Sequence, residues 1–154
     1  MNTVSFIDTS ILCNLVPVPG RDQKALEVKQ ELTERLGRGE RFILPITSVI
    51  ETGNFIAQLA NGWERRETAE RLDAILRLIS EGKAPWVLND VAWDKSFLKQ
   101  LLDGADTETN YVEHAVCQLG VGDLCIITER FQYWKRSQIR ATIWTLDEQL
   151  SSYS

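Results

Sequence analysis

Four short runs of β-branched, aromatic and aliphatic residues recur along the chain, each followed by a longer stretch of helical character. The runs are residues 3–7 (TVSFI), 41–44 (RFIL), 86–88 (WVL) and 140–144 (RATIW). Such residues favour strands. Strands that alternate with helices are joined by crossovers, which make the strands parallel and place helices on both faces of the sheet. The sequence therefore predicts an α/β fold, a three-layer α/β/α sandwich around a mainly parallel sheet.

The stretches between these runs predict helices because their apolar residues recur at intervals of three and four. The predicted helices begin near residues 9, 22, 48, 64, 90, 110, 123 and 148. Asn89 and Asp90 are predicted to cap the helix that carries Phe97 and Leu101. The chain has no internal repeat and no linker long enough to divide it, so we expect residues 1–154 to form one domain.

Composition excludes several classes of protein. The chain has 154 residues, 44% of them hydrophobic, but no apolar stretch of about 20 residues that would cross a membrane. Its first residues lack the pattern of a signal peptide, so we expect a cytoplasmic protein without membrane contact. Cys13, Cys117 and Cys125 lack metal-ligand spacing and are predicted to be buried free thiols, and the single His114 is predicted to be structural.

Four acidic residues follow or begin apolar segments that read as strand ends or helix starts. Asp8 and Asp147 are the first acids after the first and last predicted strands; Asp123 follows Gly122 at a predicted helix start, and Glu51 is expected in the first turn of its helix. In an open parallel sheet, ligands bind beyond the carboxyl ends of the strands. The four carboxylates are therefore predicted to converge on one edge of the sheet.

Four carboxylates at one place repel one another strongly unless a cation compensates them. Mg²⁺ or Mn²⁺ would do so, because both prefer carboxylate oxygens and keep positions open for substrate phosphate oxygens. We expect Asp8, Asp123 and Asp147 to ligate a first ion, and Glu51 to orient a water or help hold a second ion. Hydroxyl groups of Thr9 and Thr145 are expected to support these ligands by hydrogen bonds.

Each acid also has an interpretation as a helix cap. Asp8, Asp123 and Asp147 each precede or start a predicted helix, where a carboxylate can cap the first amides. Glu51 follows Ser48 by three residues, the spacing of a capping box. Capping does not explain why acids follow the apolar runs of both the first and the last strand.

The segments FIDTSIL, ITSVIETGNF, GVGDLCIITERF and IWTLDEQL resemble, in the same order, the four acidic motifs of PIN-domain ribonucleases, including VapC-type toxins of toxin–antitoxin pairs. Asp8, Glu51, Asp123 and Asp147 fall on the acidic positions of that family, and Thr9 or Ser10 falls where a hydroxyl often supports the site. The resemblance implies Mg²⁺- or Mn²⁺-dependent endonucleolytic cleavage of RNA. It also implies a homodimer and, in the toxin subfamily, a small antitoxin partner.

The segment RFQYWKR at residues 130–136 interleaves basic and aromatic residues. Arg130, Lys135 and Arg136 are therefore candidate RNA contacts. The alternative is that helical spacing places Phe131 and Trp134 in the core and leaves the basic residues as ordinary surface groups. A net charge of −5 does not favour nucleic-acid binding by bulk electrostatics.

Other α/β enzymes and a non-enzyme role compete with this interpretation. A phosphatase of the haloacid dehalogenase kind needs a second acid two residues after the first, where this chain has Ser10. A receiver domain needs paired acids at the first strand and a late Lys. The remaining alternative is a non-catalytic interaction or scaffold protein with a PIN-like fold, in which the acids serve as caps.

Overall fold

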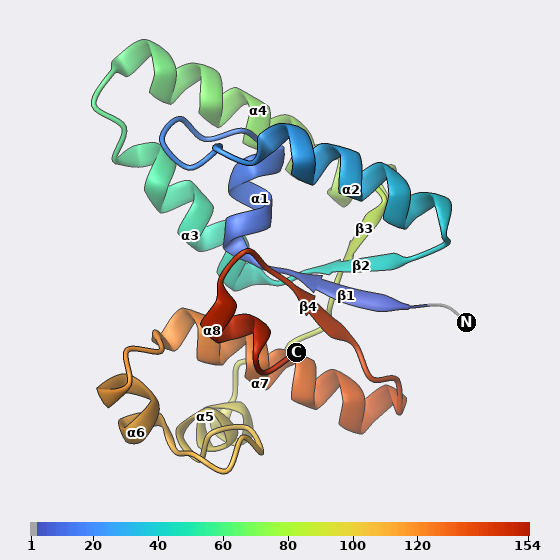
Figure 1. Cartoon of the computed structure of the whole chain (residues 1–154), viewed down its shortest axis with the longest axis vertical. Coiled ribbons are helices and arrows are strands. Elements are labelled where there is room, and N and C mark those ends of the chain that lie inside the picture. Colours follow the sequence, from blue (N-terminus) through green and yellow to red (C-terminus); the bar gives the residue numbers. More distant parts are fainter. Residues whose placement is uncertain (1–2) are drawn as a thin grey trace.

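The computed structural model describes residues 3–154 and contains a four-stranded, all-parallel sheet in the order β3-β2-β1-β4. The strands are β1 (Val4–Ile7), β2 (Arg41–Leu44), β3 (Trp86–Leu88) and β4 (Thr142–Trp144). The helices are α1 (Thr9–Leu15), α2 (Ala25–Gly37), α3 (Ile46–Ala57), α4 (Gly62–Ser80), α5 (Lys95–Leu102), α6 (Tyr111–Val116), α7 (Val121–Ser137) and α8 (Glu148–Ser151). Helices α1 to α4 lie on one side of the sheet and α5 to α8 on the other (Figure 1). The predicted α/β/α sandwich is confirmed.

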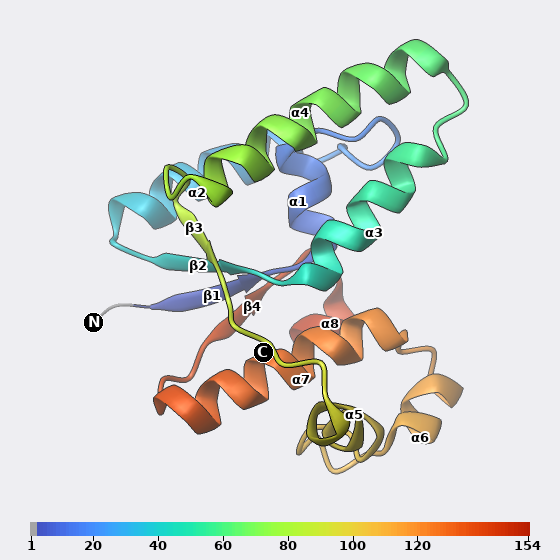
Figure 2. The ribbon, with the colours of Figure 1, turned by 180° about the vertical axis from the view of Figure 1, so that it is seen from behind.

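Side chains that alternate along the strands build a separate core on each face of the sheet. On β2, Phe42 and Leu44 pack into the core beneath α1 to α4, whereas Ile43 packs into the core against α7. On β1, Phe6 joins the α7 side and Ile7 the opposite side. The view from behind shows the sheet between these two helical layers (Figure 2). Because both faces are covered, the strands are almost uniformly apolar rather than alternating.

Strand β1 lies at the centre of the sheet, paired in parallel with β2 on one side and β4 on the other. The Asp8 amide donates to the carbonyl of Trp144, which extends the β1–β4 pairing by one residue. The residues that follow β1, β2 and β4 therefore leave the sheet at the same edge. This edge is where the acidic residues were expected.

Two of the helix starts that differ from the prediction have a clear local cause. Helix α3 starts at Ile46, directly after the N-cap residue Pro45, because the fixed φ of Pro suits a helix start and α3 needs no side-chain cap there. Helix α5 is capped by Asp94, whose carboxylate accepts from the amide of Phe97, so the predicted cap at Asn89 and Asp90 is wrong. Residues 89 and 90 instead lie in the connection after β3.

The predictions for the cysteines and for His114 have mixed outcomes. Cys13 is buried and Cys125 is half-buried, but Cys117 is exposed, so the prediction of three buried thiols is wrong for Cys117. Cys117 directly follows the short helix α6, at the surface. His114 is buried, its Nε2 lies 2.7 Å from the hydroxyl of Thr107, and its ring meets Tyr153 edge-on. Across residues 3–154, no helix is both long and apolar enough to cross a bilayer.

A buried carboxylate fastens the connection after β3 to α7. Glu129 on α7 accepts a hydrogen bond of 3.2 Å from the amide of Asn89, and Arg136 donates to the side-chain oxygen of Asn89 and to the carbonyl of Asp90. Burial raises the pKa of the Glu129 carboxyl to about 7, although the bond from Asn89 and the charge of Arg136 act in the opposite direction. A proton is therefore held more firmly in the folded state than in the unfolded state.

This proton makes stability depend on pH. The folded protein retains it up to about pH 7, whereas the unfolded chain releases it near 4.5, so stability should fall as pH rises through this window, by at most about 3 kcal/mol. Glu129→Gln keeps the acceptor for Asn89 but has no proton to lose. Urea unfolding should show that the free energy of unfolding of the variant, relative to that of the wild type, is higher at pH 8 than at pH 5. Glu34→Gln, at an exposed position on α2, is the control; parallel pH profiles for all three proteins would contradict the expectation.

Candidate metal and nuclease site

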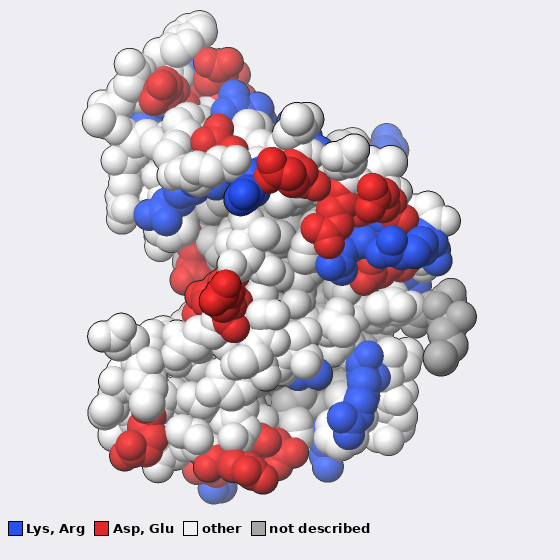
Figure 3. All heavy atoms as spheres, in the orientation of Figure 1, with Lys and Arg blue, Asp and Glu red and all other residues white. Residues whose placement is uncertain are grey.

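All four predicted acids line one pocket beyond the carboxyl ends of β1 and β4. The pocket has a volume of ≈370 Å³. Its acidic wall consists of Asp8, Glu51, Asp123 and Asp147, which come from both helical layers and span most of the chain. Acidic side chains gather in the hollow between the two layers on the face shown in Figure 3. This cavity is called the acidic pocket below.

Asp8 is the most buried of the four acids and is held by three donors. Its Oδ2 accepts hydrogen bonds of 2.7 Å from the hydroxyl of Ser10 and 2.7 Å from the hydroxyl of Thr145, and a longer bond from the Ser10 amide. Asp8 is therefore the N-cap of α1, as the capping interpretation expected. The hydroxyl of Thr145 also joins Asp8 to β4, so the orientation of this carboxylate depends on two segments that are far apart in sequence.

Glu51 lies in the second turn of α3, not in the first, because the helix begins at Ile46. The capping-box interpretation is wrong, since Ser48 is buried and its hydroxyl donates to the carbonyl of Ile7. The Glu51 carboxylate instead accepts a hydrogen bond of 2.6 Å from the hydroxyl of Thr9. This bond directs the Glu51 side chain from α3 toward the start of α1.

Gly122 leaves the space that the Glu51 carboxylate occupies. A Cβ atom at position 122 would lie 2.6 Å from Oε2 of Glu51, which is far inside van der Waals contact. Any other residue at 122 would therefore displace Glu51. This close approach brings Glu51 of α3 against the first turn of α7, one residue before Asp123.

Asp147 combines a capping role with a place in the acidic pocket. Its Oδ1 accepts from the amides of Gln149 and Leu150 and so caps α8. Its own amide donates to the hydroxyl of Thr145, the same hydroxyl that donates to Asp8. Only Oδ1 of Asp147 accepts the capping hydrogen bonds, so Oδ2 takes no part in the cap.

The convergence of the four acids affects the pKa of Asp123. Burial, followed by the charges of Asp8, Asp147 and Glu51 in that order, raises the pKa of the Asp123 carboxyl to about 7. Asp123 lies in the first turn of α7, but the N-cap residue is Gly120, so Asp123 is not the cap. The other three acids therefore act on Asp123 as near, like charges within one pocket.

The donor chemistry of the pocket fits a hard divalent cation. Carboxylate oxygens are the ligands that Mg²⁺ and Mn²⁺ prefer, and burial and the charges of the other three acids raise the pKa of Asp123 in the same pocket. Within residues 3–154, however, no group of three or more acidic, His or Cys side chains is close enough to hold an ion as it stands. The hydroxyls of Thr9, Ser10 and Thr145 hold Glu51 and Asp8 in their present positions.

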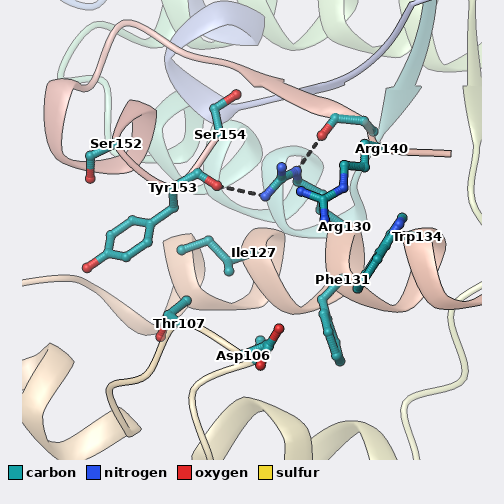
Figure 4. Close-up of a pocket in the computed structure, with 12 residues that line it drawn as sticks. Asp106, Thr107, Ile127, Arg130, Phe131, Trp134, Arg140, Ser152, Tyr153 and Ser154 are labelled. Atoms are coloured by element: carbon teal, nitrogen blue, oxygen red, sulfur yellow. Dashed lines mark hydrogen bonds between the residues drawn. The ribbon is translucent and has the colours of Figure 1, made fainter. Parts of the chain in front are cut away.

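Of the three basic residues that were candidate RNA contacts, Arg130 lines a different pocket, shown in Figure 4. Arg130 donates to the carbonyls of Ala141 and Tyr153, so its guanidinium fastens the C-terminal segment to α7. Arg136 donates to the connection after β3, and Lys135 is exposed, 5.9 Å from the ring centroids of Phe131 and Trp134. None of the three lines the acidic pocket. Arg130 is thus more buried than an ordinary surface residue, and the RNA contact stays a prediction.

The acidic pocket includes an arginine and a phenylalanine that were not predicted as site residues. Arg21 and Phe55 line the pocket together with the acids. Arg21 follows Pro19 and Gly20 in a loop, and Phe55 was predicted only as an apolar helix residue. Their contact joins positions 34 residues apart, so periodicity within either segment carries no signal of it.

Comparisons with protein-family models, with curated proteins and with solved structures find no significant match to this chain. The resemblance to PIN-domain ribonucleases therefore stays a prediction from the motifs. The convergence of the acids is a property of the structure and does not depend on the resemblance.

The repulsion in the acidic pocket gives the first prediction for this site. Because the folded-state pKa of Asp123 is raised to about 7, its ionised form at pH 8 destabilises the protein when no cation is present. Asp123→Asn should therefore raise the melting temperature at pH 8 in the presence of a chelator. Mn²⁺ at 100 times its dissociation constant should stabilise the wild type by about 2.7 kcal/mol, and the variant much less. An equal Mn²⁺ response in both proteins would contradict a role for Asp123 in cation binding.

A pair of glycine variants tests the position of Glu51. Gly53→Ala, on α3 with open space around it, should raise stability by about 0.5–1 kcal/mol, as is usual for Gly to Ala in a helix. Gly122→Ala should keep the fold but move the Glu51 carboxylate and weaken the Mn²⁺-induced rise in melting temperature. Differential scanning fluorimetry with a Mn²⁺ titration measures both effects. If both variants respond to Mn²⁺ like the wild type, Glu51 does not contribute to cation binding.

Proposed function

We propose that this chain is a Mg²⁺- or Mn²⁺-dependent endoribonuclease that hydrolyses RNA phosphodiester bonds in the acidic pocket. The observation that carries the proposal is the convergence of Asp8, Glu51, Asp123 and Asp147 on one cavity, where burial and the charges of the other three acids raise the pKa of Asp123. Such a concentration of carboxylates in a water-accessible cavity is typical of sites for hard cations. The resemblance of the four motifs to PIN-domain ribonucleases supports RNA as the substrate.

The four carboxylates would hold the ion, and the surrounding hydroxyls would orient them. A divalent cation in such a site neutralises charge on the phosphate and acts as a Lewis acid toward phosphate oxygens and water. Thr145 and Ser10 fix the direction of Asp8, and Thr9 fixes that of Glu51. These bonds limit the rotamers of the ligands and so reduce the entropy lost when an ion binds.

The hydrogen bonds also explain how the pocket can be acidic and yet lack a closed ligand shell. Asp8 and Glu51 each direct one oxygen toward a hydroxyl donor, at 2.7 and 2.6 Å, in the arrangement described. These donors offset part of the repulsion among the carboxylates in the absence of an ion. Asp8, Glu51, Asp123 and Asp147 are the residues that would hold a cation in this pocket.

Further features implied by the resemblance stay predictions. These are toxin activity, a small antitoxin partner and a homodimer. Cytoplasmic residence, which was expected from the first residues of the sequence, also stays a prediction. Size-exclusion chromatography with light scattering tests the homodimer directly. A small open reading frame directly upstream of the gene would favour a toxin, and its absence would favour a free-standing nuclease.

Cleavage of labelled RNA in Mg²⁺ or Mn²⁺ tests the proposal. Asp8→Asn should remove cleavage, but Asp8 is buried, so a second variant is needed to separate chemistry from folding. Asp147→Asn serves, because Asn caps helices about as well as Asp. It should keep the melting temperature near that of the wild type and lower the rate by at least about a hundredfold.

Asp94→Asn is the matched control for Asp147→Asn. Asp94 is also an N-cap, of α5, and lies outside the acidic pocket. We expect this variant to cleave like the wild type. Undiminished cleavage by Asp147→Asn and Asp8→Asn, or no cleavage by the wild type in either cation, would refute the nuclease assignment and favour a non-catalytic scaffold.

A further inference from the structure

The loop between α1 and α2 places one arginine at the rim of the acidic pocket. The guanidinium carbon of Arg21 lies 3.4 Å from the centroid of the Phe55 ring on α3. Both residues line the acidic pocket beside Glu51 and Asp123. Among residues 3–154, Arg21 is therefore the one basic residue that lines this cavity together with the acids.

Several hydrogen bonds fix the loop that carries Arg21. The Arg21 amide donates to the carbonyl of Val18, and the buried side chain of Asn14 accepts from the Lys24 amide. On the outer side, Arg71 of α4 donates to the carbonyls of Val16 and Pro17, at 3.0 and 2.8 Å. The loop is therefore held from α1 and from α4, and the place of Arg21 at the pocket is set by the fold.

The guanidinium of Arg21 retains its donors for a ligand. Among residues 3–154 it forms no ion pair, although four carboxylates share its pocket, and it donates no side-chain hydrogen bond. One face of the group lies on the Phe55 ring, which stabilises the cation and restricts its motion. A planar, pre-oriented guanidinium with unused N–H groups is well suited to bidentate binding of a phosphate.

A second cavity adjoins the acidic pocket on the far side of this contact. It has a volume of ≈400 Å³ and is also lined by Gln58 and Leu59 of the α3 end. Gly20, Arg21 and Phe55 line both cavities. The stacked pair Arg21–Phe55 therefore forms the boundary between a cavity rich in carboxylates and a cavity with mixed apolar and polar walls.

We propose that Arg21 binds a phosphate of the substrate next to the one that is cleaved, and that the second cavity receives the nucleoside beyond it. This inference rests on the proposed function and specifies its substrate as single-stranded RNA with at least two phosphates. A duplex would keep that nucleoside paired and stacked, whereas a separate cavity suits an unpaired one. Because the protein has a net charge of −5, one oriented cation contributes much of the attraction for the RNA.

Two substrates separate this role from a general effect on the site. One is a single-stranded RNA octamer, and the other is a dinucleoside monophosphate, which has only the phosphate to be cleaved. Arg21→Ala should raise KM for the octamer about tenfold and leave kcat nearly unchanged. The same variant should cleave the dinucleoside monophosphate like the wild type. Arg21→Lys should recover part of the loss, because it keeps the charge but not the planar pair of donors.

A matched control and a salt series exclude unspecific charge effects. Lys29→Ala removes one positive charge from an exposed position on α2, outside both cavities, and should change neither KM. The slope of log affinity against log salt concentration should fall by about 0.7 in Arg21→Ala, the contribution of one phosphate contact on a single strand. Equal losses on both substrates, or no loss on the octamer, would overturn the proposal.

Binding measurements keep this inference separate from the nuclease assignment. If the wild type cleaves neither substrate, the proposed function fails, and fluorescence anisotropy with the labelled octamer in Mg²⁺ then tests Arg21 alone. About tenfold weaker binding by Arg21→Ala than by the wild type and Lys29→Ala would support an RNA-binding groove. Equal binding by all three proteins would refute it.

Discussion

The parallel pairing of β1 between β2 and β4 is the constraint on which the acidic pocket depends. It brings Asp8, at the end of β1, beside Thr145, at the end of β4, where the threonine hydroxyl donates to the carboxylate. Helix α3, which follows β2, then presents Glu51 to Thr9 at the start of α1. If β1 and β4 were not adjacent, Asp8 and Asp147 would belong to different parts of the surface. The site is thus a consequence of strand order rather than of any single motif.

The acids act at once as structural groups and as a charged cluster. Asp8 and Asp147 cap α1 and α8, and these caps would stabilise the helices with no ion present. Asp123 caps nothing, and its raised pKa records the unfavourable side of the arrangement. A carboxylate that forms no cap, is partly buried and is repelled by its neighbours is unfavourable in its ionised form unless a counter-charge is present. For this reason Asp123, rather than the better-held Asp8, is the acid whose substitution best tests whether the pocket binds a cation.

The sequence predicts the strands and the meeting of the acids well, because both follow from local apolar runs and from one rule about parallel sheets. It predicts Glu51 less well. Ser48 and Glu51 have capping-box spacing, but Pro45 already starts the helix, and burial directs the Ser48 hydroxyl to the Ile7 carbonyl. Asp90 and Asp94 compete for one helix start, and the choice of Asp94 depends on how far the chain runs beyond β3. The contact of Arg21 with Phe55 joins a loop to another helix and has no local signature.

Arg71 gives the fold a property that concerns residues far from the chemistry. Arg71 is half-buried on α4 and donates to the carbonyls of Val16 and Pro17, just after α1. It therefore supports the loop that carries Arg21. Helix α4 contributes no residue to the walls of the acidic pocket. It contacts the loop at the rim of the pocket through the hydrogen bonds of Arg71. Substitutions along α4, or molecules that bind its outer surface, would thus change how firmly the rim is held while leaving the carboxylates in place. In the nuclease proposed above, the support for substrate binding at the rim is therefore distinct from the carboxylates that would perform cleavage.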